Sequence, residues 1–281
     1  MSCWRPRLLR PGQSIVSCHD DSTLEHNVDW LLDQCDTPDK AVLALTDGAG
    51  QCIALFVHDG EIGLGLGEVQ LGSAKVRRHV LVGNYPQYDE TDWLQILAAL
   101  HGNLGPQSAV YLMGVVDSEP LHLALRSKEI RRLFWVSPHG QSYLRRLFEV
   151  GDSLDTYLQS LPSRAQKDLR RSLRRFRQRF GDQVEVEVFR SPDEVESFLR
   201  KVEPVSARTY QARLLDQHIS LEGFIGRKAM RAAQRGWTRC YLLSCGGEPL
   251  AWRIGFLYQG TFFSHHVGYS PEYAKWHPGV V

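Results

Sequence analysis

The chain has 281 residues, a length typical of about two domains. Hydrophobic residues make up 43% and charged residues 23%, a balance that excludes a disordered, collagen-like or coiled-coil chain. The formal net charge is only +1, but it is unevenly spread: residues 1–150 hold 13 basic and 18 acidic side chains, and residues 151–281 hold 20 and 14. We therefore expect an acidic first domain and a basic second domain with an anionic partner.

The cysteines predict neither a disulfide framework nor a metal site. They are Cys3, Cys18, Cys35, Cys52, Cys240 and Cys245, and they form no CxxC pair and no zinc spacing. Such usage is typical of a reducing cytoplasm. No apolar run reaches the roughly 18 residues of a membrane span, and the N-terminus lacks the apolar region of a signal peptide. We expect a cytoplasmic protein without a membrane span, and the composition leaves its oligomeric state open.

The first half predicts a mixed α/β domain. Gly63, Gly65 and Gly67 lack the GxGxxG spacing of a phosphate loop and do not open a helix, so we expect them in a strand or turn. The expected elements are a hairpin over 41–57 around Asp47–Gly50, a strand over 75–82, a helix over 92–101, a strand over 109–116, a helix over 118–127 and a strand over 132–136.

A domain boundary is expected near Gly151, followed by a helix over 152–160 and a long basic helix over 163–180. Ser163 and Gln166 have the spacing of a capping box, and Gly181 has the place of a C-cap. One face of this helix is an apolar stripe of Ala165, Leu169, Leu173, Phe176 and Phe180. The other faces carry Arg164, Lys167, Arg170, Arg171, Arg174, Arg175, Arg177 and Arg179, against Asp168.

The remainder predicts a second α/β domain. We expect a strand over 184–189, a helix that starts at Pro192 behind the Ser191 cap, a helix over 221–235, and an antiparallel meander of strands over 238–245, 249–258 and 261–269. The sequence then stops at HPGVV. Because a half-built sheet would leave a long hydrophobic edge, we expect the natural sequence to continue past Val281 with an amphipathic helix and a further strand.

From about residue 130 onward, the order of these segments resembles one family. The segment LPSRAQKDLRRSLRRF, the strand GGEPLAWRIGF and the run HHVGYSPEYAKWHPG are similar to acyltransferases of the GNAT superfamily. The similarity is to the cellulose-biosynthesis-associated CelD/BcsL type with its BioF2-like acetyltransferase domain, which is related to the Fem peptidyltransferases. The similarity covers about half of the chain, and its segments are specific only when they are taken together.

The resemblance implies an α/β fold of two tandem GNAT-like domains, each a mixed, mostly antiparallel sheet flanked by helices. They would span residues 1–150 and 151–281, the second incomplete at its C-terminus. It also implies acyl-CoA as the co-substrate, held along the last strand and at His277, Pro278, Gly279 and Val280. A turn with free backbone N–H groups suits the CoA diphosphate. Part of the active site would lie beyond this chain.

Acyl transfer to an amine needs a base for the amine proton and a donor for the developing oxyanion. His265 and Tyr269 are the catalytic candidates, because the period of two predicts that they share a face of the last strand, with His266 on the other. The alternative is that both histidines are ordinary packed or solvated sheet residues. Cys240 and Cys245 leave a covalent intermediate formally open, and no His or Cys spacing predicts a metal.

The basic helix admits three interpretations: a solvated face, an electropositive wall for an anionic substrate or CoA phosphate, and a nucleic-acid surface. Because its phenylalanines belong to the apolar stripe, stacking on bases is disfavoured. We take Arg170, Arg171, Arg174 and Arg175 as candidate substrate-binding residues.

The leading hypothesis is an acyl-CoA-dependent N-acyltransferase that acts on a small-molecule, sugar or peptide amine in polysaccharide or cell-envelope biosynthesis. The rivals are a Fem-like transferase that uses aminoacyl-tRNA and a non-catalytic module on a GNAT scaffold that binds RNA or another polyanion.

Overall fold

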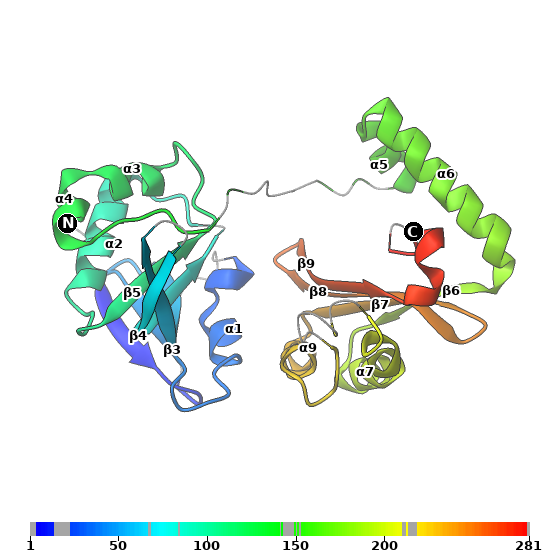
Figure 1. Ribbon diagram of the computed structural model, residues 1–281, viewed down its shortest axis with the longest axis horizontal. Helices are drawn as coiled ribbons and strands as arrows, with labels where there is room; N and C mark the ends of the chain where they lie inside the picture. Colours follow the sequence, from blue (N-terminus) through cyan, green and yellow to red (C-terminus); the bar gives the residue numbers. More distant parts are fainter. Residues whose placement is uncertain are drawn as a thin grey trace. The chain divides into compact units, whose positions relative to one another are not determined.

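The computed structural model describes residues 4–13, 23–66, 69–83, 85–140, 142, 149, 151, 153–209, 212 and 218–279. The chain divides into two compact units, Met1–Gly140 and Gln141–Val281, each with its own sheet flanked by helices (Figure 1). The predicted mixed α/β class is confirmed. That the first unit is itself a GNAT-like domain stays a prediction.

The first unit is built on a five-stranded sheet in the order β1-β2-β3-β4-β5. The strands are β1 (Arg5–Leu9), β2 (Ala41–Thr46), β3 (Cys52–Leu66), β4 (Val69–Val82) and β5 (Ser108–Met113). All neighbours are antiparallel except β4 and β5, which run parallel across the crossover helix α2 (Glu90–His101). The predicted hairpin is β2–β3. Gly63 and Gly65 lie in β3, whereas Gly67 is outside the described residues.

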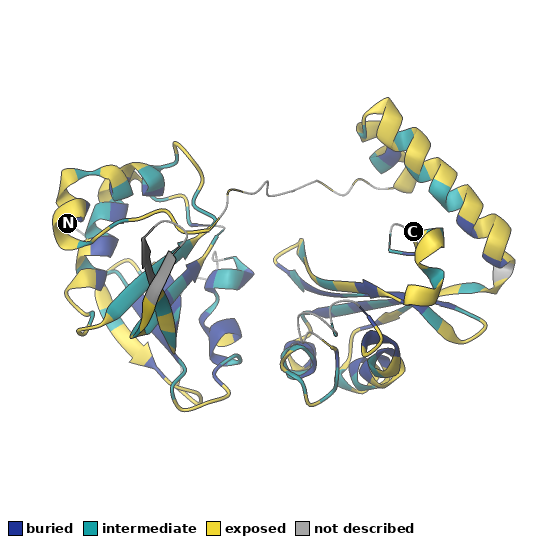
Figure 2. Cartoon of the chain, in the orientation of Figure 1, coloured by how far each residue is buried: buried dark blue, intermediate teal, exposed yellow. Residues whose placement is uncertain are grey.

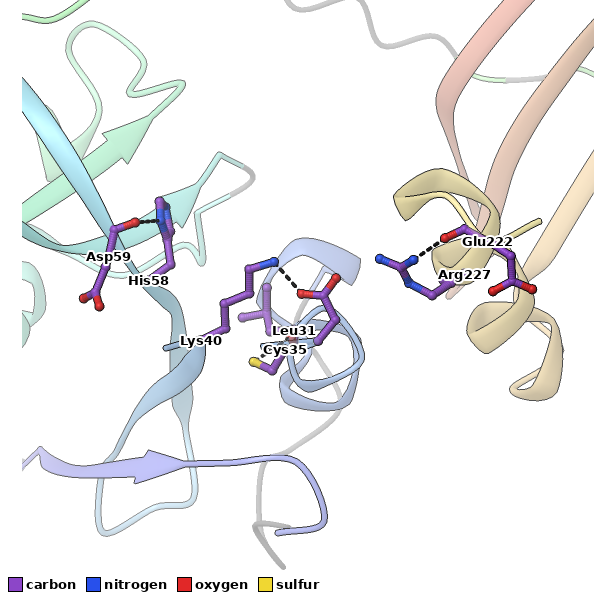
Figure 3. Close-up of polar contacts among 8 residues, drawn as sticks. Leu31, Cys35, Lys40, His58, Asp59, Glu222 and Arg227 are labelled. Carbon is purple, nitrogen blue, oxygen red and sulfur yellow. Dashed lines mark hydrogen bonds and ion pairs between the residues drawn. The ribbon is translucent and has the colours of Figure 1, made fainter. Parts of the chain in front are cut away.

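Short helices pack around this sheet: η1 (Leu24–His26), α1 (Val28–Leu32), α3 (Pro120–Arg126) and α4 (Lys128–Leu133). The strand expected over 132–136 is wrong. Ser127 caps α4 by accepting a hydrogen bond from the Ile130 N–H, so the chain is helical up to Leu133, and residues 134–136 are irregular. At the end of α1, the Cys35 thiol donates to the Leu31 carbonyl, and Lys40 pairs with Asp36 just before β2 (Figure 3).

The second unit is built on an antiparallel four-stranded sheet in the order β6-β7-β8-β9. The strands are β6 (Val184–Phe189), β7 (Thr238–Cys245), β8 (Glu248–Tyr258) and β9 (Thr261–Tyr269), followed by η3 (Pro271–Trp276). The last three strands form the predicted meander.

Helices α7 (Pro192–Ser206) and α9 (Phe224–Gln234) cover one face of this sheet (Figure 1). The predicted Ser191 capping box is present, with the Glu194 carboxylate accepting from the Ser191 N–H at 2.9 Å. Trp252 lies on this covered face beside Gly268, where an added Cβ would meet the Trp252 ring at 2.3 Å. The close approach of β9 to Trp252 therefore requires glycine.

Helices α5 (Leu154–Ser160) and α6 (Ser163–Phe180) form a helical hairpin joined at Leu161 and Pro162. The expected Ser163–Gln166 capping box is absent, because Pro162 takes the N-cap position. The Gln166 amide instead donates to the carbonyls of Leu161, at 2.8 Å, and Gln159, at 3.4 Å. These bonds tie the end of α5 to the first turn of α6. A short turn, η2 (Gly181–Gln183), leads from α6 into β6.

Only the C-terminal end of α6 is packed against the sheet. Phe176 and Phe180 are buried there with Leu243 and Ala251, and the rest of the helix is mostly exposed (Figure 2). The N-terminal part of the predicted apolar stripe is only half-covered at Leu169 and Leu173, and Ala165 is exposed. The long helix is thus anchored at one end.

In the described part of the chain, no helix is both long enough and apolar enough to cross a bilayer.

The packing of α6 at one end predicts that substitutions there lower the free energy of unfolding more than substitutions elsewhere on the helix. Phe176 is 1% exposed, so Phe176→Ala should lower the free energy of unfolding of the second unit by about 3–5 kcal/mol through a core cavity. Leu169→Ala, on the half-covered stretch of the same helix, should cost clearly less. Urea denaturation of both variants measures this, and equal losses would show that the whole stripe is packed.

Candidate functional site

The sequence-predicted catalytic residues lie on β9, which is the last strand in the described sheet of the second unit. Its register with β8 is interrupted: Gly255 pairs with Ser264, and Ile254 pairs with His266. His265 is therefore the extra residue of a β-bulge. Such a bulge places two residues opposite one and redirects the side chains at that point.

The bulge turns His265 toward the helix-covered face of the sheet. Its ring packs edge-on against buried Phe256, with 5.5 Å between the centroids, and its Nε2 lies 3.1 Å from the Lys228 Nζ on α9. The expectation that His265 and Tyr269 share a face is wrong, because simple alternation does not hold across a bulge. Tyr269 instead pairs with Ala251, which packs with Phe176 on the opposite face.

The surroundings of His265 favour the neutral imidazole. Burial of the ring, then the Lys228 and His266 charges, lower the pKa of His265 from 6.5 to about 4, although the residue keeps a solvent-exposed part. Because a lysine ammonium can only donate, Nε2 accepts from Lys228. A base role for His265 therefore requires Lys228 to move away from that nitrogen.

Lys228 is a residue that sequence reasoning missed. It lies on the first turns of α9, and the Arg227 side chain next to it donates to the Glu222 carbonyl in the preceding loop (Figure 3). Nothing local marks Lys228, because α9 and β9 are far apart in the sequence and meet only in the fold.

Tyr269 and Gly279 come together on the other face of the sheet. Tyr269 is 43% exposed, and a Cβ added at Gly279 would lie 3.5 Å from its Cδ1. His277 ends η3 in the left-handed conformation, with φ 52°, and Pro278 is buried. Val280 is outside the described residues. The turn at 277–279 therefore lies beside Tyr269 rather than beside His265.

The cysteine alternative loses support at Cys240. Burial raises the pKa of its thiol to about 12, and its side chain is fully enclosed in the core. A nucleophilic cysteine needs an exposed thiolate, so Cys240 is unsuited to covalent catalysis. In the described residues, no group of three or more His, Cys, Asp or Glu side chains could hold a metal ion.

The structure divides the four candidate arginines of α6 into two pairs. Arg170 and Arg174 line a groove of about 680 Å³ between α5 and α6, and Arg171 and Arg175 do not. Arg177 lines the same groove and was missed as a candidate. The spacing of 170, 174 and 177 would have found it, since residues three and four apart share a helix face.

The Lys228–His265 contact predicts a measurable titration shift. Removal of the cation in Lys228→Gln should raise the pKa of His265 above about 4 but keep it below 6.5, because burial is the larger cause. NMR titration of the His265 ring measures this value. Lys201→Gln is the matched control, because Lys201 pairs with Glu187 at 2.8 Å and should leave His265 unchanged. Equal shifts in both variants would contradict a specific contact.

The lowered pKa of His265 also predicts how the stability of the fold changes with pH. The unfolded chain takes up the His265 proton near pH 6.5, whereas the folded chain takes it up near pH 4. Protonation in that window therefore favours the unfolded state, and His265 reduces stability progressively as the pH falls from 6.5 to 4.

Residues 163–281 match a protein family described as "Acetyltransferase (GNAT) domain". This part of the chain, from the start of α6 onward, therefore carries a domain of the GNAT superfamily. No curated protein matches the chain. A crystal structure titled "Conserved Protein of Unknown Function" from Bacteroides thetaiotaomicron VPI-5482 is similar in fold. It has 14% identity and a TM-score of 0.52, and the alignment covers 91% of this chain and 75% of that one.

Proposed function

We propose that the acetyltransferase (GNAT) domain of residues 163–281 transfers an acyl group from acyl-CoA to an amine. The observation that carries the proposal is the family match over this range, which includes the whole β6–β9 sheet. The bulge in β9 adds support, because it interrupts the pairing of the strand on which a thioester would lie.

The reaction joins the amine nitrogen to the thioester carbonyl carbon, breaks the carbon–sulfur bond and releases the thiol. The amine must lose a proton and the departing sulfur must gain one. Tyr269 suits protonation of the sulfur, because its exposed phenol can donate a proton and it lies beside the 277–279 turn. Neutral His265 suits removal of the amine proton only after release from Lys228, and it lies on the opposite face of the sheet.

The residues at the turn are compatible with an acyl-CoA diphosphate. Gly279 has no side chain between its backbone and an approaching phosphate, and Tyr269 limits the space on its other side. Of the described turn residues, Gly279 is the one whose backbone N–H can bind an anion, because Pro278 has no N–H and the His277 N–H donates to the Ala274 carbonyl at 3.0 Å. Val280, the fourth residue of the proposed site, belongs to the same run of sequence.

The proposal extends to the acceptor substrate and its biological setting. The resemblance to the CelD/BcsL type favours a sugar or peptide amine in polysaccharide or cell-envelope biosynthesis, within the cytoplasm. The Fem-like alternative would use an aminoacyl-tRNA, and the non-catalytic alternative would bind a polyanion. Acyl-CoA binding separates the leading proposal from both.

Calorimetric titration with acetyl-CoA tests the turn. Gly279→Val should raise the dissociation constant for acetyl-CoA with little change in melting temperature, because the branched side chain blocks the backbone. Gly279→Ala is the matched control, since its Cβ would lie at an ordinary 3.5 Å contact from Tyr269. No heat with the wild-type chain, together with RNA retention that falls steeply with salt, would favour the polyanion alternatives.

Steady-state kinetics test the two faces of β9. Tyr269→Phe should lower kcat by roughly 10²-fold or more with an almost unchanged KM for acetyl-CoA, because the ring remains and only the proton donor is lost. His265→Ala reports on the opposite face in the same assay. A larger loss at His265 than at Tyr269 would move the proton-transfer role to the bulge.

A further inference from the structure

The groove between α5 and α6 has one strongly basic wall. Arg170, Arg174 and Arg177 line it from α6, and none of their side chains forms an ion pair or hydrogen bond with the described residues. Asp155 on α5 is the acidic side chain in the lining, and it pairs with none of the three. The groove therefore keeps a net positive charge with no paired carboxylate to neutralise it.

The rest of the lining is apolar with a polar rim. Leu158 of α5 is buried, Leu173 of α6 is half-buried, and Leu154 is 56% exposed in the groove. Ser153 and Asp155 stand at the start of α5. A ligand here would meet guanidinium groups on one side and an apolar surface on the other. This combination suits an organic phosphate better than a free inorganic ion.

The number of guanidiniums favours two linked phosphate groups, on which the long arginine side chains can converge. Residues 170 and 177 lie roughly 10 Å apart along the helix axis, at a rise of about 1.5 Å per residue. One phosphate accepts two parallel hydrogen bonds from a single guanidinium, so three guanidiniums in a row provide more donors than one phosphate accepts well. A diphosphate uses all three.

We propose that the α5–α6 groove binds the diphosphate of a nucleotide-type acceptor substrate. The assignment to the acceptor rests on the proposed acyltransferase function, whereas diphosphate binding in the groove does not. Arg170, Arg174 and Arg177 hold the two phosphates, and Leu154, Leu158 and Leu173 receive the adjoining organic part. The carboxylate of Asp155 accepts hydrogen bonds from hydroxyl or amino groups of that organic part.

The remaining arginines of α6 provide a built-in comparison. Arg164, Arg171 and Arg175 carry the same charge on the same helix but do not line the groove. A diffuse polyanion surface would use both sets, because it depends on charge alone. A ligand bound in the groove would contact only the set of arginines that lines it.

The test is calorimetric titration of the full chain with inorganic pyrophosphate at constant ionic strength. The groove variant is Arg170→Gln with Arg174→Gln and Arg177→Gln, and the control is Arg164→Gln with Arg171→Gln and Arg175→Gln. Each loses three charges, and glutamine keeps a helix propensity close to that of arginine. Circular dichroism and thermal melting establish that both variants keep the fold.

We expect the groove variant to weaken pyrophosphate binding by more than about tenfold and the control variant to change it by less than about threefold. Equal weakening in both variants would overturn the proposal in favour of a diffuse basic face. Absence of wild-type binding at millimolar pyrophosphate would overturn it as well.

Two further titrations separate the sources of the diphosphate. Acetyl-CoA should bind the groove variant as it binds the wild type, because its own diphosphate lies at the 277–279 turn. Loss of acetyl-CoA binding in the groove variant would overturn the assignment to the acceptor. A single-stranded RNA oligonucleotide that binds both variants equally weakly would instead identify the helix as an RNA surface. If acetyl-CoA does not bind the wild type but pyrophosphate does, the proposed function fails and the groove stands.

Discussion

The second unit depends on the complete burial of one face of β8. Every second residue from Trp252 to Tyr258 is at most 5% exposed, and the side chains include Ile254 and Phe256. Full burial of a large apolar side chain contributes about 1.5–3 kcal/mol, so this row outweighs any surface ion pair in the unit. A one-residue slip would expose the whole row, and the registers of β7 and β9 follow from it.

The regular pairing of β9 with β8 is interrupted by the bulge opposite Gly255, and this bulge decides the direction in which the β9 side chains point. It sends His265 to the side of α9, against Phe256 and Lys228, and leaves Tyr269 on the side of the 277–279 turn. The Tyr269 phenol near the turn and the His265 imidazole near Lys228 are thus held on opposite faces.

Helix α6 combines a firm anchor with an unneutralised charge. Phe176 and Phe180 fix its end to the sheet, while the Gln166 bonds fix its start to α5. Between these points the guanidiniums of Arg170, Arg174 and Arg177 line a groove without pairing to a carboxylate of the described residues. Like charges at helical spacing repel one another, so the arrangement costs stability unless an anion is bound.

The sequence by itself determined the features that depend on near neighbours. The period of the apolar residues predicted α6 and the β7–β9 meander, and Ser191 with Glu194 predicted the start of α7, because caps, turns and amphipathic faces are set within a few residues. The resemblance carried by the segments from LPSRAQKDLRRSLRRF to HPG predicted the superfamily. Local signals failed where two were in competition, as at Pro162 against Ser163 and at α4 against a strand.

Only the tertiary structure decided which of the predicted residues meet. The sheet register created the bulge that separates His265 from Tyr269, and the packing of α9 brought Lys228 to His265 across 37 positions of sequence. The position of α5 selected Arg170, Arg174 and Arg177 from eight basic residues that look equivalent in the sequence. The physical reason is common to all three: periodicity gives the face on which a side chain lies, but the neighbour that covers this face comes from another element of the chain.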